Sequence, residues 1–401
     1  MSGDDDSFSI SQGLERAVSL LREIPSQLDS LPETFPEVGI GENMALDTLA
    51  PHVLGQATKL DAPETFAHMD PPTPWITWAM ALWNARLNQN LLHQETSPFA
   101  TEAEQRVIRW LTPFFGMGGG HMCCGSTVSN LTALWAARDA GGVRRVVASE
   151  SAHLSIRKAA SILGLTYEEI EVDTHDQLNP QFLGDLTDAC LVLTAGTTTT
   201  GAIDPLNLAG RSAWTHVDAA WSGPLRLCSK YAHLLNGIEG ADSVTMSAHK
   251  WLFQPKDSAL ILFRNPELAN PAISFTSGYL SEPNIGVQGS RGAAAIPLLA
   301  TLMAWGREGI AERLDRAMVS AQNLAENVSV DEHFDLWAMP KTGITLFRPV
   351  SGETKEFYSR LPPEMLSLCS IHGTHWLRSV AANPLADVHR ILVAIEQAHP
   401  E

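Results

Sequence analysis

The feature that most constrains the fold is a series of short apolar segments that alternate with helical patterns between residues 129 and 263. Such alternation is typical of βαβ units, whose strands form a largely parallel sheet with helices on both faces. The chain is therefore predicted to have an α/β fold. The predicted strands are 145–148, 169–172, 190–194, 214–217, 243–246 and 259–263. The predicted helices that alternate with the first of these strands are 129–140, 154–163 and 180–186.

The regions on either side of this alternation have different patterns. Residues 1–60 contain two helical patterns with too few apolar residues for a core of their own, so they are expected to pack on a partner subunit in a dimer or on the large domain. Residues 61–270 form the predicted large domain. Residues 271–401 contain a long helical pattern, two strand patterns and a closing helix, which predicts a small C-terminal α+β domain.

Composition and charge exclude several classes of protein. The formal net charge of -18 disfavours nucleic acid and anionic membranes as partners. Residues 1–12 are acidic, which predicts disorder and does not match the basic start of a secretory signal. No apolar run approaches the ~18 residues of a membrane span. The cysteines and histidines have neither disulfide-framework nor metal-ligand spacing, so no metal site and a cytoplasmic location are expected.

Two polar residues follow predicted strands. Lys250 comes shortly after segment 243–246, and Asp218 directly follows segment 214–217. Ligand sites in parallel sheets lie at the carboxyl ends of the strands, so both side chains are expected at one edge. This pair suits pyridoxal phosphate, which needs a lysine for its Schiff base and an acid beside its pyridine nitrogen. A short Ser-X-His-Lys match alone more often marks a surface lysine, so the neighbouring motifs decide the interpretation.

A turn rich in Gly, Ser and Thr precedes the helical pattern at Gly125. Backbone N–H groups at a helix N-terminus, together with small hydroxyls, bind phosphate. Ser126, Thr127 and Val128 are the predicted donors, and an ordinary helix cap is the alternative interpretation.

Two further motifs follow predicted strands. His153 would stack on a pyridoxal ring, although a lone histidine is more often structural. Four consecutive threonines, from Thr197 to Thr200, lie between two glycines, which is unusual for a simple capped turn.

In this order and spacing, the motifs resemble the group II pyridoxal-phosphate-dependent amino-acid decarboxylases, such as the glutamate, aromatic, cysteine sulfinate and diaminobutyrate enzymes. The resemblance extends from about Phe66 to Ile395. It implies an aspartate-aminotransferase-like fold of type I and a homodimer with a shared active site. The motifs that carry it are His68-Met-Asp-Pro-Pro72, Ser97-Pro98, Gly125-Ser126-Thr127, His153, Gly196-Thr-Thr198, Gly201-Ala-Ile-Asp204, His216-Val-Asp-Ala-Ala220, His249-Lys-Trp251, Gly289-Ser-Arg291, Leu377-Arg378 and Asn383-Pro384.

The resemblance assigns roles to these residues. Lys250 would be the Schiff-base lysine and Asp218 the partner of the pyridine nitrogen. His153 would stack on one face of the ring, and Ala220 would pack near the other. Thr198 would orient the cofactor and the substrate carboxylate. The phosphate would be held by Ser126, Thr127, Val128, Ser247 and His249.

The C-terminal part supplies two more expected contacts. Ser290 would reach the cofactor phosphate of the partner subunit, and Arg378 would contact the substrate. Lys250, His153 and Asp218 are the expected catalytic residues.

The implied reaction is decarboxylation of an L-amino acid to an amine and carbon dioxide. Relatives such as the aromatic amino-acid decarboxylases carry a loop tyrosine that helps to protonate the α-carbon, whereas segment 280–289 contains none. Decarboxylative oxidative deamination, or another reaction of the fold, is therefore an alternative. A non-catalytic scaffold is a second alternative, which the retention of Lys250, Asp218 and His153 disfavours. The choice between acidic, basic and aromatic substrates stays open.

Overall fold

The computed structural model describes residues 12–28 and 30–398. The chain divides into two compact units, Met1–Lys59 and Leu60–Glu401. In the first unit, α1 (Gln12–Leu20) and α2 (Glu42–Val53) are joined by an ion pair in which Arg16 Nε lies 3.0 Å from Asp47 Oδ1. Residue 12 begins α1, and the rest of the acidic segment predicted to be disordered lies outside the described residues.

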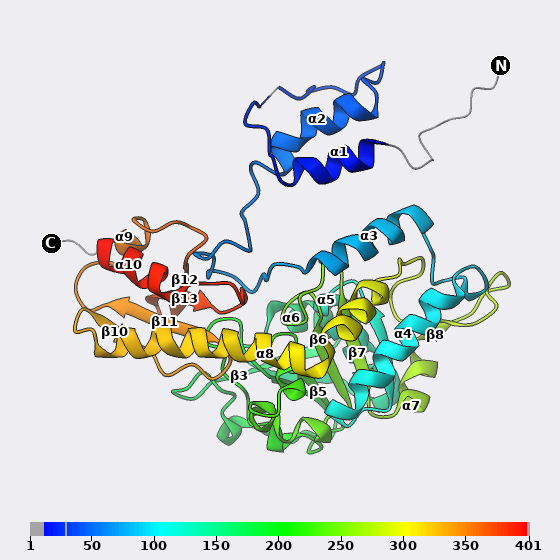
Figure 1. The fold of residues 1–401 in the computed structure, drawn as a ribbon. Helices are drawn as coiled ribbons and strands as arrows, with labels where there is room; N and C mark the ends of the chain where they lie inside the picture. Colours follow the sequence, from blue (N-terminus) through cyan, green and yellow to red (C-terminus); the bar gives the residue numbers. More distant parts are fainter. Residues whose placement is uncertain (1–11, 29, 399–401) are drawn as a thin grey trace, which may run out of the picture. The chain divides into compact units, whose positions relative to one another are not determined.

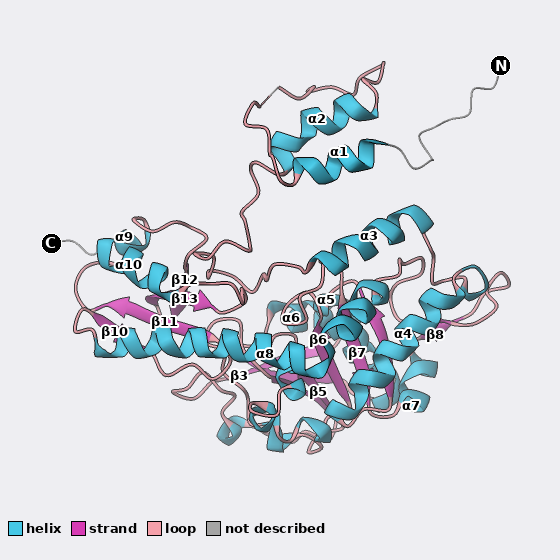
Figure 2. Cartoon of the chain, in the orientation of Figure 1, coloured by secondary structure: helices cyan, strands magenta, loops and turns pink. Residues whose placement is uncertain are grey.

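A seven-stranded sheet forms the centre of the second unit and lies between helices (Figure 2). Its order is β1-β7-β6-β5-β4-β2-β3; β7 is antiparallel to both of its neighbours and the other pairs are parallel. The predicted α/β class with a mostly parallel sheet is therefore confirmed. The strands are β1 (Gly119–Cys123), β2 (Arg145–Ser149), β3 (Thr166–Ile170), β4 (Ala189–Thr194), β5 (Trp214–Asp218), β6 (Ser243–Ser247) and β7 (Ala259–Phe263).

The strands β2, β4 and β7 are buried on both faces of this sheet, which explains why they are largely apolar. On β2, Val146 packs in a cluster with α5 (Ser126–Gly141) and α6 (Leu154–Leu163). The next residue, Val147, belongs to the cluster that contains residues of α4 and α8. The remaining helices around the sheet are α3 (Trp75–Leu87), α4 (Pro98–Leu111), α7 (Pro266–Ala272) and the long α8 (Ala295–Val330).

Three local expectations differ from the structure. Segment 180–186 was predicted to be a helix, but only Pro180–Phe182 forms a short 3-10 turn. The strand predicted at 169–172 begins earlier, at Thr166, because Gly164 ends α6 with a φ of 68° and the chain enters the sheet at once. The unpredicted strand β1 contains Gly120, where a Cβ atom would lie 2.1 Å from Ile261 O. Glycine there permits close strand approach and does not interrupt the sheet.

The C-terminal part contains a second, antiparallel sheet of order β10-β11-β13-β12. In Figure 1, α8 extends from the large sheet to this smaller one. The predicted division at residue 270 stays a prediction. None of the described helices is both long and apolar enough to cross a membrane. The other elements are β8 (Ser274–Phe275), β9 (Asn284–Ile285), β10 (Phe334–Leu336), β11 (Ile344–Pro349), α9 (Thr354–Tyr358), β12 (Ser367–Ile371), β13 (Thr374–Val380) and α10 (Val388–Ala398).

Candidate active site

A cavity of about 370 Å³ lies beside the carboxyl ends of β4, β5 and β6 and the N-terminus of α5. This is the sheet edge where ligands bind in open α/β folds. Ten residues predicted to bind the cofactor line it, namely Ser126, Thr127, Val128, His153, Thr198, Asp218, Ala220, Ser247, His249 and Lys250. Residues separated by more than a hundred positions in the sequence are thus brought into one site.

One end of the cavity is built to receive an anion. The first amides of α5 and the hydroxyls of Ser126 and Ser247 meet there, and these two hydroxyls are hydrogen-bonded to each other. His249 has a buried Nδ1 with no hydrogen-bond partner among the described residues. The pKa of the His249 imidazole is lowered to about 4, chiefly by burial and further by the positive charges of Lys256 and Lys250. Helix amides, hydroxyls and an unpartnered ring nitrogen form a suitable set for a phosphate.

Asp218 ends β5 and is almost completely buried. Its Oδ2 accepts a hydrogen bond from Asn130 Nδ2 at 2.8 Å, and its Oδ1 accepts one from the backbone of Ala220 at 3.1 Å. Asn130 was not predicted to take part in the site. The signal available in the sequence was an asparagine near the start of the helical pattern that follows the Gly125-Ser-Thr turn, and the structure shows that it is fully buried.

His153 caps the N-terminus of α6 and lines the same cavity. Its Nδ1 lies 2.8 Å from Ser155 Oγ and accepts the Ser155 backbone N–H at 3.3 Å. The pKa of His153 is lowered, mainly by burial, so the neutral imidazole is favoured.

Lys250 follows β6 and lies in the cavity wall. Burial is the main cause that lowers the pKa of its amine, while the negative charge of Asp218 opposes this shift. A lowered pKa increases the share of neutral amine, which is the form that attacks a carbonyl carbon.

Arg378 lies on β13, outside the lining of this cavity, but it contacts the loop that carries Thr198. Its Nε donates to Thr198 O at 2.8 Å, and its Nη1 donates to Ala67 O at 3.3 Å. Burial lowers its pKa to about 10. Among the described residues, no carboxylate forms an ion pair with this guanidinium.

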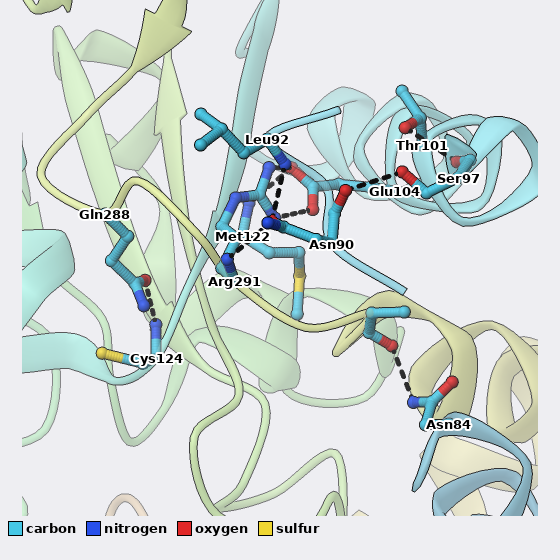
Figure 3. A network of polar contacts seen from close by, with 11 residues as sticks. Asn84, Asn90, Leu92, Ser97, Thr101, Glu104, Met122, Cys124, Gln288 and Arg291 are labelled. Atoms are coloured by element: carbon cyan, nitrogen blue, oxygen red, sulfur yellow. Dashed lines mark hydrogen bonds and ion pairs between the residues drawn. The ribbon is translucent and has the colours of Figure 1, made fainter. Parts of the chain in front are cut away.

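Ser290 lines a different cavity, of about 550 Å³, which shares Cys124 with the first one. Figure 3 shows how its neighbourhood is fixed: Arg291 is paired with Glu104, and Gln288 Oε1 accepts the Cys124 N–H at 2.8 Å. The predicted contact of Ser290 with a partner's phosphate stays a prediction. The pairing with Glu104 occupies the guanidinium of Arg291.

Asp204 is a buried carboxylate that holds the threonine-rich loop. It accepts the backbone N–H of Leu178 and that of Thr194, each at 2.7 Å. Its pKa is raised to about 7, chiefly by burial, with smaller contributions from Asp176 and Asp173. The loop after β4 is therefore anchored by a side chain that titrates near neutrality.

This shift predicts a specific dependence of stability on pH. The folded-state pKa of Asp204 exceeds its ordinary value, so its contribution is fully present below pH 3.8 and is lost as pH rises to about 7. The loss amounts to at most about 4 kcal/mol. Urea unfolding from pH 4.5 to 8 is expected to show this decline in the wild type and a flatter profile in Asp204→Asn. Parallel profiles would contradict the assignment.

Comparison with known proteins identifies the family. The sequence profile described as "Pyridoxal-dependent decarboxylase conserved domain" matches residues 25–350. The chain belongs to the pyridoxal-dependent decarboxylase family. It is 32% identical to the L-2,4-diaminobutyrate decarboxylase of Rhizobium meliloti (strain 1021), with 95% of this chain and 86% of that protein covered. It is 29% identical to the aspartate 1-decarboxylase of Aliivibrio fischeri, with 81% and 70% covered.

Solved structures agree on the fold. A crystal structure of Oryza sativa TDC with PLP and tryptamine superposes with a TM-score of 0.85 at 22% identity, covering 99% of this chain and 97% of that one. The glutamate decarboxylase domain of a Vibrio parahaemolyticus protein gives a TM-score of 0.83 at 20% identity, with 99% and 97% covered. The resemblance to group II decarboxylases and the type I fold predicted from the motifs are thereby confirmed.

The protein is a pyridoxal-phosphate-dependent amino-acid decarboxylase, and its cavity fits that cofactor. When bound, pyridoxal phosphate acts as an electron sink for the carbanion left at the α-carbon. The anion-binding end suits the phosphate, Asp218 offers a carboxylate for the ring nitrogen, and Lys250 offers an amine for covalent attachment. The individual roles of these residues stay predictions.

Proposed function

We propose that this decarboxylase acts on an L-amino acid whose side chain carries a positive charge, with L-2,4-diaminobutyrate as the representative substrate. The observation that carries the proposal is a third cavity, of about 440 Å³, which shares His153 and Thr198 with the cofactor cavity. Among the described residues that line it are two carboxylates, Glu150 and Asp176, and no lysine or arginine.

The charge balance of this third cavity favours a cationic group. Asp176 is buried, and its carboxylate accepts hydrogen bonds only from hydroxyls, those of Ser151, Thr197 and Thr200, among the described residues. A buried carboxylate without a cationic partner attracts an ammonium group strongly, because the local dielectric constant is low. Two relatives named L-2,4-diaminobutyrate decarboxylase support the same choice, at 32% and 27% identity.

The proposed reaction divides the work among a few side chains. Arg378 and Thr198 orient the substrate α-carboxylate, and the apolar part of the cavity lining, made by Val128, Ala220 and Trp221, limits access of water there. Loss of carbon dioxide is favoured when the carboxylate leaves water for such a pocket. Asp218 stabilises positive charge at the ring nitrogen. The candidates for delivering a proton to the α-carbon are His153, Lys250 and a residue of the partner subunit.

Replacement of Arg378 by glutamine is expected to raise the KM for the amino acid by about 10- to 100-fold while kcat changes less. This range corresponds to the loss of hydrogen bonds to a charged carboxylate. Steady-state kinetics would measure it. Arg348→Gln is the control, because Arg348 lies on the neighbouring strand β11 and pairs with Asp335 at the surface. An unchanged KM in Arg378→Gln would contradict the role in carboxylate binding.

The function is tested by incubating the pyridoxal-phosphate-loaded protein with L-2,4-diaminobutyrate, L-aspartate and L-tyrosine. Carbon dioxide and 1,3-diaminopropane are expected, with kcat/KM for diaminobutyrate at least about tenfold higher than for the other two. Asp176→Asn should reduce that preference, since it removes a carboxylate from the third cavity. A preference for aspartate or tyrosine would overturn the substrate class.

The same assay separates the alternative reactions. Aldehyde, ammonia and peroxide in place of the amine would indicate oxidative deamination, the alternative raised by the absence of tyrosine from segment 280–289. Absence of carbon dioxide with every substrate would support the non-catalytic scaffold.

A cytoplasmic homodimer completes the proposal. All five cysteines have free thiols, which suits a reducing compartment. Helix α3 exposes Trp75, Trp78 and Trp83, and exposed aromatic clusters mark interaction surfaces. A second copy of the chain is the proposed occupant, and it would also bring Ser290 to the partner's site. Light scattering of the purified protein should give twice the chain mass of 43.5 kDa.

A further inference from the structure

Asn130 lies at the centre of a buried hydrogen-bond network behind the cofactor cavity. Its Nδ2 is 2.8 Å from Asp218 Oδ2 and 2.9 Å from Ser155 Oγ, and its Oδ1 is 3.1 Å from His216 Nε2. An ionised carboxylate accepts hydrogen bonds and donates none, so the amide nitrogen must face Asp218. This fixes the orientation of the amide group and the direction of every other bond in the network.

The first consequence concerns His216. The amide oxygen accepts, so His216 Nε2 carries the proton. Burial lowers the pKa of His216 to about 4, and the neutral ring therefore has an unprotonated Nδ1. That nitrogen accepts from Ser243 Oγ at 2.9 Å, and Trp214 Nε1 donates to the same oxygen at 2.9 Å. The donor and acceptor in each of these hydrogen bonds are thus determined, so the His216 side of the network holds Asn130 in place.

The second consequence concerns His153. Ser155 Oγ accepts one N–H of Asn130, which leaves the hydroxyl proton of Ser155 to be donated to His153 Nδ1 at 2.8 Å. The backbone N–H of Ser155 points to the same ring nitrogen. Two donors converge on Nδ1, so the proton of the neutral ring resides on Nε2. Because His153 lines the cavity, this N–H is the one available to a bound molecule.

We propose that Asn130 is a positioning residue whose two amide N–H groups orient Asp218 directly and set the tautomer of His153 through Ser155. The carboxylate that faces the cofactor ring and the imidazole that stacks on it are thereby fixed by one side chain. This role belongs to the cofactor site and does not depend on which amino acid is decarboxylated.

The His153 half of the proposal is tested without the cofactor. Nitrogen NMR of histidine-labelled apoprotein should report His153 as the Nε2–H tautomer in the wild type. Asn130→Ala and Ser155→Ala are expected to give a mixture of the two tautomers. His153→Gln assigns the signal. A wild-type tautomer that persists in both variants would overturn this half.

The Asp218 half is tested by the binding of pyridoxal phosphate. Asn130→Ala should weaken binding about tenfold or more, as expected for loss of a hydrogen bond to a charged group, whereas Ser155→Ala should stay within about twofold of the wild type. Asn383→Ala is the matched control, because Asn383 is also buried and makes two hydrogen bonds, to Ala62 O and from Leu385 N.

Two results would overturn the Asp218 half. One is wild-type affinity in Asn130→Ala, and the other is an equal loss in Asn383→Ala. If Asn130→Ala does not fold, Asn130→Asp replaces it, because this variant keeps the shape and removes the donor to Asp218. Unchanged affinity in that variant would equally contradict the proposal, and Ser155→Ala alone then decides the His153 half.

Discussion

Lys250→Ala is expected to bind pyridoxal phosphate without the visible absorbance band of a lysine-linked cofactor and to lose decarboxylase activity by about 10²- to 10⁴-fold or more. This range is the contribution of a positioned acid–base group alone, and Lys250 is also the attachment point. The amine lies in the cavity wall, and burial lowers its pKa, which increases the share of the neutral, nucleophilic form. Spectra and product assays on the reconstituted variant measure both effects.

A neighbouring lysine provides the control. Lys256 is largely exposed and pairs with Asp70. Lys256→Ala removes the same functional group six positions along the chain, and it is expected to keep the absorbance band and most of the activity. Retention of the band in Lys250→Ala, or its loss in Lys256→Ala, would contradict the assignment of the attachment lysine.

The placement of the site could be predicted because a general rule of parallel sheets applies to it. Asp218 ends β5 and Lys250 follows β6, and these two strands are parallel neighbours. Their carboxyl ends therefore lie at the same edge of the sheet, which could be predicted without knowing the loop conformations. The phosphate-binding turn at Gly125 was recognisable for a similar reason, since a helix N-terminus is a local feature of the sequence.

The network behind the cavity could not be predicted in the same way. Asn130 is one of the buried polar residues of α5, together with Ser129 and Thr132, and a sequence pattern does not reveal which groups from other strands meet it. Strand β1 was not predicted, because consecutive glycines are typical of a loop, while in the structure Gly120 is needed for close packing against β7. The ion pair between Arg291 and Glu104 could not be predicted either, because the two residues are far apart in the sequence.

Asp218→Asn is expected to lower kcat by about 10²- to 10³-fold while pyridoxal phosphate still binds. An amide has the shape of the carboxylate but no negative charge, so it cannot stabilise a protonated ring nitrogen. Removal of one preorganised electrostatic group commonly costs this much in rate. Asp242→Asn is the matched control, because its carboxylate accepts the Thr215 N–H at 2.8 Å at the opposite end of β5.

A double substitution tests whether Asn130 acts through Asp218. If the amide mainly orients this carboxylate, Asn130→Ala should slow the reaction in the wild type but should add little once Asp218→Asn is present. Effects of groups in direct contact are not additive, whereas those of independent groups are. The contact between Asn130 Nδ2 and Asp218 Oδ2 at 2.8 Å predicts the first outcome. Fully additive losses in kcat would show that Asn130 supports the reaction by another route.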